Sequence, residues 1–277
     1  MPCAALLAVG LNLQSIRAAD LTAEEHLANA QSTLRIGDLK TAGREGDQAV
    51  ALAPNNALAH MVRGRVHSEA GEGKKAVASY TRALELDPSR SALYQWRGSE
   101  QFKLGHIKES IQDFDTYLER FPDQEPHHWQ RGISYYYAGQ YKEGRRQFES
   151  HQTVNGSDVE NAVWHFLCVA AVEDPDQARE VFIPITGDRR VPMAEVHALF
   201  QGKGDAATVM KAAEAGDLTP ERKRMQLFYA HLYLGLYYEA MKDDAKAREH
   251  ILKAAELSES ANYMGAVARV HADRLKK

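Results

Sequence analysis

The chain has 277 residues, of which 26% are charged, 44% hydrophobic and 8% aromatic. This balance is ordinary for a folded protein and excludes intrinsic disorder. The net charge of -4 provides no basic excess to neutralise phosphates, so nucleic acid is not expected as a partner. Two cysteines are too few for a disulfide framework, and no apolar run is long enough to predict a transmembrane segment.

The amino-terminal residues resemble a secretory signal peptide. Residues 3–13 are apolar except for Asn12, and the small residues Ala18 and Ala19 precede a polar, acidic stretch. We therefore assign residues 1–19 to a signal peptide and expect an exported protein, periplasmic or secreted. No Lys or Arg precedes the apolar run, so the alternative is a cytoplasmic protein in which this segment packs on the first repeat.

From residue 20 the sequence repeats with a period of 34 residues. The recurring positions hold proline, turn glycine, helix glycine and aromatic residues, in the series Pro54, Pro88, Pro122; Gly37, Gly71, Gly105, Gly139; Gly64, Gly98, Gly132; and Tyr80, Phe114, Phe148. Several independent series on one period indicate a repeated structural unit.

Each repeat predicts two helices joined by a glycine turn. Gly105 can take the left-handed conformation that ends the first helix, and Pro88 suits the entry to the next unit. Gly98 on the first helix faces a small residue on the second, so the two backbones can approach closely while Phe114 fills the space beside them. One unit cannot bury its apolar face alone, so the units must stack into a nearly one-dimensional core.

This pattern resembles the tetratricopeptide repeat (TPR) family. Residues 20–158 contain four units, over 23–56, 57–90, 91–124 and 125–158, and the second carries the pattern most fully. The resemblance implies an all-α, right-handed α-solenoid of helix-turn-helix units.

Residues 159–222 break the period. We expect buried helical residues at 163–169, a short helix at 177–182, an extended loop at 183–188 and two further helices at 193–200 and 206–215. These elements are interpreted as irregular helical pairs that continue the solenoid, with an inserted helical subdomain as the alternative.

Residues 223–277 are expected to form a further TPR-like unit and a capping helix. Lys242-Asp243 replaces Gly-Asp at the turn of this unit. Residues 261–276 have an apolar helical pattern with a charged face, which we interpret as the solvating cap that repeat arrays need. The carboxyl half, 125–277, also weakly resembles bacterial NlpI-like TPR lipoprotein adaptors.

No catalytic motif occurs in the sequence, so we expect no enzyme activity and no cofactor. Metal binding is not expected either, because His26, His60 and His128 recur on the period and mark a structural position. Cys168 lies among apolar residues and is interpreted as a buried, inert thiol.

Arg63, Arg97 and Arg131 also recur every 34 residues. They could form a basic ladder for an acidic ligand, or each could cross to the second helix of its own unit. We favour the structural role, in which Asp113 is the partner of Arg97.

In the TPR family the first helices line a concave groove that binds ligands. Carried onto this sequence, the resemblance predicts a peptide-binding groove formed by Met61, Arg65, Trp96, Phe102, Lys103, Trp129, Ile133 and Tyr136. The alternative for Trp96 and Trp129 is that they pack between units as core. Aromatic and arginine side chains dominate binding hot spots, so a peptide with apolar anchors and some acidic character would suit this surface. The predicted function is a non-catalytic adaptor or scaffold that binds a protein or peptide. The alternative is a structural assembly subunit that self-associates, for example as a homodimer.

Overall fold

The structure is a computed structural model that describes residues 21–258 and 262–276. Within these ranges the chain is helical and has no strand. The predicted signal peptide, residues 1–19, lies outside them. The helices are α1 (Ala23–Arg35), α2 (Leu39–Leu52), α3 (Ala57–Glu69), α4 (Gly73–Leu86), α5 (Ala92–Lys103), α6 (Ile107–Arg120), η1 (Pro122–His127), α7 (Trp129–Tyr137), α8 (Tyr141–Gln152), α9 (Val159–Val172), α10 (Pro175–Glu180), α11 (Met193–Phe200), α12 (Ala206–Glu214), α13 (Pro220–Ala240), α14 (Asp244–Leu257) and α15 (Tyr263–Arg274).

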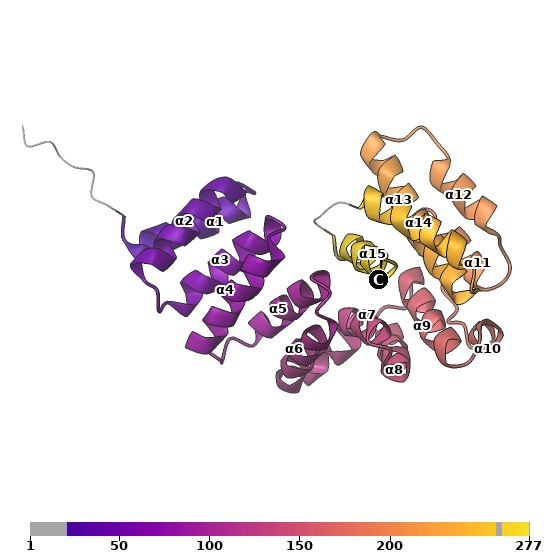
Figure 1. The fold of residues 1–277 in the computed structure, drawn as a ribbon, viewed down its shortest axis with the longest axis horizontal. Coiled ribbons are helices and arrows are strands. Elements are labelled where there is room, and N and C mark those ends of the chain that lie inside the picture. Colours follow the sequence, from indigo (N-terminus) through magenta and orange to yellow (C-terminus); the bar gives the residue numbers. More distant parts are fainter. Residues whose placement is uncertain (1–20, 259–261, 277) are drawn as a thin grey trace, which may run out of the picture.

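Consecutive helices pair as antiparallel hairpins that stack along a curved path (Figure 1). The four predicted units are the pairs α1–α2, α3–α4, α5–α6 and α7–α8. Helix α7 is short because the 3₁₀ helix η1 occupies the beginning of the fourth unit. The predicted all-α solenoid is confirmed.

Glycine at the helix crossings sets the close approach within each hairpin. A Cβ atom placed on Gly98 would lie 2.8 Å from the ring of Phe114, and one on Gly64 would lie 2.5 Å from the ring of Tyr80. These contacts are shorter than van der Waals distance, so only glycine lets the aromatic ring lie flat against the first helix. The predicted packing of aromatic residues against small residues is therefore confirmed.

The turns between paired helices use left-handed backbone. Gly37, Gly71, Gly105 and Gly139 have φ angles of 79°, 73°, 77° and 74°. In the hairpin α13–α14 the equivalent residue is Lys242, with φ of 60°. A side chain is disfavoured in this region of backbone space, so Lys242 is strained where the other turns are not.

The middle segment forms the helices that the sequence predicts. Helix α9 is buried on nearly all sides and packs against α8, α10, α11 and α13. Cys168 on α9 is fully buried, and burial raises the pKa of its thiol, as expected for an inert cysteine. The long helix α13 then forms a hairpin with α14, and this hairpin corresponds to the predicted TPR-like unit.

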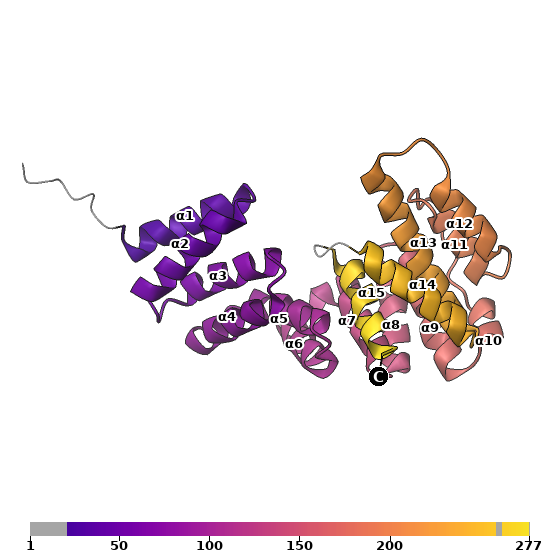
Figure 2. The ribbon, with the colours of Figure 1, turned by 45° about the horizontal axis from the view of Figure 1, so that its top comes forward.

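Helix α15 is not the solvating cap that the sequence predicts. It turns back onto the inner side of the arc and contacts both α14 and α5 (Figures 1 and 2). Its apolar residues Met264, Val267 and Val270 are buried, and so are the small residues Ala268 and Ala272. Because small residues cover the faces between the larger apolar ones, neighbouring helices can approach α15 from several sides.

None of the described helices combines the length and the apolar character needed to cross a membrane.

Candidate functional site

The predicted groove residues fall into two groups. Met61, Arg65, Trp96 and Lys103 lie on α3 and α5 and keep solvent exposure. Phe102, Ile133 and Tyr136 are buried, and Trp129 is partly covered. The inner face of the solenoid is therefore open around Met61, Arg65, Trp96 and Lys103 and closed around Phe102, Ile133 and Tyr136.

The open part, which we call the open groove, is a hollow of about 480 Å³ between α3, α5 and α7. Its lining combines aromatic, amide, hydroxyl and charged side chains, namely Arg65, Ser68, Glu69, Tyr80, Gln95, Trp96, Ser99, Glu100, Lys103 and Gln130. It includes three of the predicted site residues, Arg65, Trp96 and Lys103.

Trp96 is the main aromatic residue of the open groove. Its ring centroid lies 6.0 Å from that of Tyr80, and the Arg65 guanidinium lies over the ring at 5.5 Å from its centroid. Tyr80 is fixed by its packing against Gly64, so it forms a rigid support beneath Trp96. Trp96 is thus half-buried and held in place, with its remaining surface available to a ligand.

Charge in the open groove is largely paired. Lys103 Nζ lies 2.7 Å from Glu100 Oε1, which also accepts a hydrogen bond of 2.7 Å from Ser68 Oγ. Because the buried Glu100 forms an ion pair with Lys103, these two charges cancel and the groove has no excess of positive charge. The expected preference for an acidic peptide is not supported by this arrangement.

An amide ladder crosses from the third unit to the fourth. Gln95 Nε2 donates to Gln130 Oε1 at 2.6 Å, and Gln95 Oε1 accepts from the ring of His128. Burial, followed by the positive charge of Arg131, lowers the pKa of His128 to about 4. His128 is therefore neutral at pH 7 and acts in this ladder as a structural donor.

The closed part is covered by α15. The ring of Tyr263 stacks on Phe102 with centroids 5.1 Å apart, and it meets the edge of Trp129 at the same distance. The prediction that Phe102, Ile133 and Tyr136 line an open groove is wrong, because all three side chains are buried. Trp129 keeps part of its surface exposed beside Tyr263 of the chain's own last helix.

A polar network fixes α15 in this position. The Tyr137 hydroxyl donates to His271 Nδ1 at 3.0 Å, and His271 Nε2 lies 3.3 Å from Glu239 Oε2. Tyr136 also donates to Glu239 Oε2 at 3.3 Å, and the guanidinium of Arg274 lies over the Tyr137 ring. Burial lowers the pKa of His271 to about 3, so the ring is neutral and donates from Nε2.

The repeated arginines have the structural role that we favoured. Arg97 binds Asp113 through two hydrogen bonds, of 2.8 Å and 2.7 Å. Arg131 donates to Gln147 at 2.8 Å and Arg63 donates to Ser79 at 3.3 Å, in each case sixteen residues along the chain. Each arginine thus joins the two helices of its own unit.

Sequence reasoning did not predict Tyr263 or His271 as residues of the inner face. Two signals were present: an aromatic residue at the beginning of the last helix, and small residues between its larger apolar ones. Neither signal says which surface the helix would cover.

The comparisons with known proteins agree with this architecture. Residues 27–91 match the family model described as tetratricopeptide repeat. The chain carries tetratricopeptide repeats. The matched TPR segment spans the first two units and the beginning of the third, and the hairpins beyond it continue the same solenoid.

Solved structures share the TPR fold at low sequence identity. A tetratricopeptide repeat protein from Parabacteroides merdae ATCC 43184 superposes with a TM-score of 0.59 and 19% identity, covering 92% of this chain and 99% of that one. MamA from Desulfovibrio magneticus RS-1, residues 41 to the end, gives a TM-score of 0.53 and 16% identity over 57% of this chain and 89% of that one. No curated protein matches the sequence. Identities this low show the fold alone, and the NlpI-like resemblance of the carboxyl half stays a prediction.

Proposed function

We propose that this TPR protein is a non-catalytic adaptor that binds a peptide segment of a partner protein in the open groove. The observation that carries the proposal is the half-buried Trp96, held by Tyr80 below it and Arg65 above it, in a hollow that the chain's own last helix leaves open. Aromatic and arginine side chains in partly enclosed hollows are the typical anchors of protein interfaces.

The lining indicates the kind of peptide. Trp96 and the neighbouring Met61 offer apolar surface for one large side chain, while Gln95, Ser99 and Gln130 can hydrogen-bond to a peptide backbone. Paired charges leave no strong electrostatic preference. The ligand that fits best is therefore an extended segment with an apolar anchor and little net charge.

A library of displayed 12-residue peptides, selected on the full chain, tests the proposal. We expect the selected peptides to contain a large apolar residue and to lose at least about tenfold in affinity when Trp96→Ala removes the anchor surface. The matched control is Lys108→Ala on α6, which lies on the outer side of α5 in Figure 1 and should leave binding unchanged.

Circular dichroism on Trp96→Ala separates a binding role from a folding role. Retained helicity with lost binding supports the groove. Selected peptides that bind Trp96→Ala as tightly as the wild type, or a variant that unfolds, would contradict the assignment of Trp96 as the anchor.

We also propose export, to the periplasm or outside the cell, on the basis of the apolar segment within residues 1–19. Sequencing the amino terminus of the protein isolated from its native cells tests this. Cleavage after Ala18 or Ala19 is the expected result, and a chain that begins at Met1 contradicts it. Self-association stays a prediction from the resemblance, to be measured by light scattering.

A further inference from the structure

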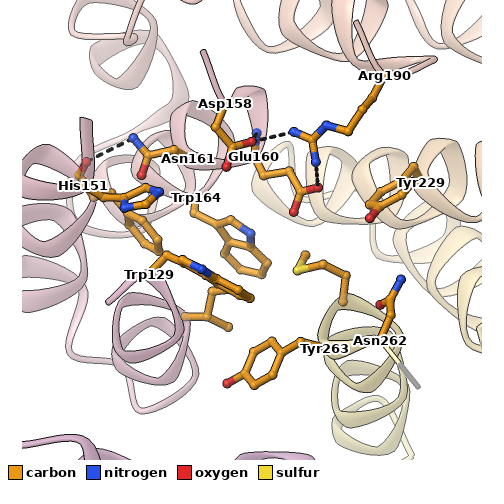
Figure 3. A pocket seen from close by; sticks show the side chains of 13 residues that line it. Trp129, His151, Asp158, Glu160, Asn161, Trp164, Arg190, Tyr229, Asn262 and Tyr263 are labelled. Atoms are coloured by element: carbon orange, nitrogen blue, oxygen red, sulfur yellow. Dashed lines mark hydrogen bonds and ion pairs between the residues drawn. The ribbon is translucent and has the colours of Figure 1, made fainter. Parts of the chain in front are cut away.

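A second hollow, which we call the inner cavity, lies between α7, α8, α9, α13 and α15 (Figure 3). Its volume is about 370 Å³, within the range of pockets that hold small ligands. One side is aromatic and the other is acidic, with the lining residues Trp129, Ile133, Phe148, His151, Asp158, Glu160, Asn161, Trp164, Arg190, Tyr229, Asn262, Tyr263 and Met264. None of them lines the open groove, so the inner cavity is a separate site.

The acidic side has more negative charge than its own cation balances. Arg190 lies 2.6 Å from Asp158, 2.6 Å from Glu160 and 2.7 Å from Asp188. One guanidinium therefore serves three carboxylates, and two negative charges remain in excess when all three are ionised. A positively charged ligand would complete this cluster.

Two carboxylates, those of Asp158 and Glu160, line the inner cavity (Figure 3). The Glu160 side chain is only 12% exposed, and burial raises its pKa to about 7 although Arg190 opposes the shift. Burial therefore destabilises the ionised Glu160 carboxylate more than the neighbouring Arg190 stabilises it. A cation bound in the cavity would stabilise the ionised carboxylate, as hydration does for an exposed glutamate.

Three residues that line the cavity carry a buried polar atom with no hydrogen-bond partner, namely Trp164 Nε1, Asn161 Oδ1 and Tyr263 Oη. Trp164 and Asn161, which are 1% and 3% exposed, provide one donor and one acceptor on the same helix. Asn161 Nδ2 donates to the Phe148 carbonyl at 3.1 Å and to Gln152 Oε1 at 3.0 Å, which fixes the amide orientation. Asn161 and Trp164 are three residues apart on α9, so they share one face of the helix.

Buried polar groups are normally paired, so this donor and this acceptor point to a ligand that supplies both partners. An amide group does so, because its carbonyl can accept from Trp164 and its N–H can donate to Asn161. Figure 3 shows Trp164 in the middle of the inner cavity, between Trp129 and the Glu160 carboxylate.

The aromatic side suits an aliphatic stem that ends in a cation. Trp129 and Tyr263 meet edge to face at 5.1 Å, and Phe148 stacks behind Trp164 at 6.5 Å. Aromatic faces bind both methylene groups and organic cations.

We propose that the inner cavity binds the basic side chain of a lysine or arginine carried on a peptide amide. The stem lies along Trp129, Trp164 and Tyr263, the cation reaches Glu160 and Asp158, and the amide pairs with Trp164 and Asn161. The proposal does not depend on the open groove.

Calorimetric titration of the full chain tests the proposal with three compounds. The first is N-acetyl-lysine N-methylamide. The second is its norleucine counterpart, which keeps the stem and the amides but lacks the charge. The third is pentylamine, which keeps an aliphatic stem and one ammonium group but lacks the amides. We expect the lysine amide to bind at least about tenfold more tightly than either of the others.

Two substitutions locate the binding. Glu160→Gln should weaken binding of the lysine amide at least about tenfold and bring it to the level of the norleucine amide. Trp164→Phe keeps an aromatic ring but removes the indole N–H. It should weaken binding of the lysine amide and leave binding of pentylamine unchanged. The matched control is Glu249→Gln on α14, whose carboxylate pairs with Lys253 outside the inner cavity.

The proposal is overturned if no compound gives a saturable signal up to about 10 mM, or if lysine and norleucine amides bind equally. Unchanged binding of the lysine amide to a folded Glu160→Gln variant also overturns it. Pentylamine that binds as tightly as the lysine amide would show that the cavity binds a free amine and not a peptide-borne side chain. If Glu160→Gln unfolds, the comparison of lysine and norleucine amides on the wild type decides.

Discussion

At the scale of single residues, the glycines at the helix crossings determine how closely the hairpins pack. The case is clearest at Gly98, where an added Cβ would lie 2.8 Å from the Phe114 ring and 3.1 Å from Asp113 Cβ. Gly43 on α2 offers the opposite case, because its Cβ would meet only Val66 at 3.8 Å.

Gly98→Ala should lower the free energy of unfolding by about 1–3 kcal/mol, because the methyl group forces α5 and α6 apart. Gly43→Ala should raise it by about 0.5–1 kcal/mol, because alanine favours the helix and no atom is displaced. Urea denaturation of both variants measures the difference. Equal effects at the two positions would show that the close approach at Gly98 does not matter.

Buried neutral histidines make the stability of the protein sensitive to acid. The pKa of His271 is lowered to about 3, and those of His128 and His231 to about 4, mainly by burial. The unfolded chain takes up these protons near pH 6.5, while the folded chain does not. The stabilising contribution is therefore complete above about pH 6.5 and is lost as the pH falls toward 4.

His271→Gln should reduce this sensitivity, since a glutamine can accept from Tyr137 and donate to Glu239 without titrating. At pH 5, protonation of this histidine in the unfolded chain lowers the free energy of unfolding of the wild type by up to about 2 kcal/mol. The variant does not have this loss. Glu160, with its pKa raised to about 7, acts in the opposite direction in both proteins, so it cancels from the comparison. Thermal unfolding at pH 7 and pH 5 tests this, and parallel losses in the two proteins would contradict it.

At the scale of the elements, the hairpin turns share one backbone geometry, in which one residue is left-handed. In the turn between α13 and α14 this residue is a lysine. Lys242 has φ of 60°, while its counterparts in the first four units are glycines. Its side chain is exposed, so removing it loses no packing.

Lys242→Gly should therefore raise the free energy of unfolding by about 1 kcal/mol. A residue with a side chain is less stable than glycine in the left-handed conformation by about that amount. Lys242→Ala keeps the Cβ and serves as the control, with no gain expected. Chemical denaturation measures both variants. A destabilised glycine variant would mean that the side chain contributes more than the strain costs.

At the scale of the whole molecule, α15 divides the solenoid into two parts. The main apolar core runs from Phe102 to Ala272, while the first three units otherwise hold two small clusters. In the described residues, the main contacts of helices α1 to α4 are with helices near them in the chain, whereas α15 joins α5 to α14. Units joined only to their neighbours are expected to open more readily than units closed into one body.

Amide hydrogen exchange should therefore be faster in α1–α4 than in α7–α9 and α13–α15. Tyr263→Ala, which removes the ring that stacks on Phe102, should speed exchange in α5, α7 and α15 and leave α1–α2 unchanged. Uniform protection along the wild-type chain would show that the solenoid opens as a single unit.

Sequence alone determined the repeat, the helical hairpins, the turn glycines and the pairing of Arg97 with Asp113. These features depend on contacts within one unit or between adjacent units, so they recur at a fixed spacing that can be read directly. Only the tertiary structure decided which part of the inner face is open. The contact between Tyr137 and His271 joins residues 134 positions apart, and no periodic signal records such a contact. The sequence predicts that an amphipathic helix has an apolar face. Which surface covers that face depends on the curvature of the whole array.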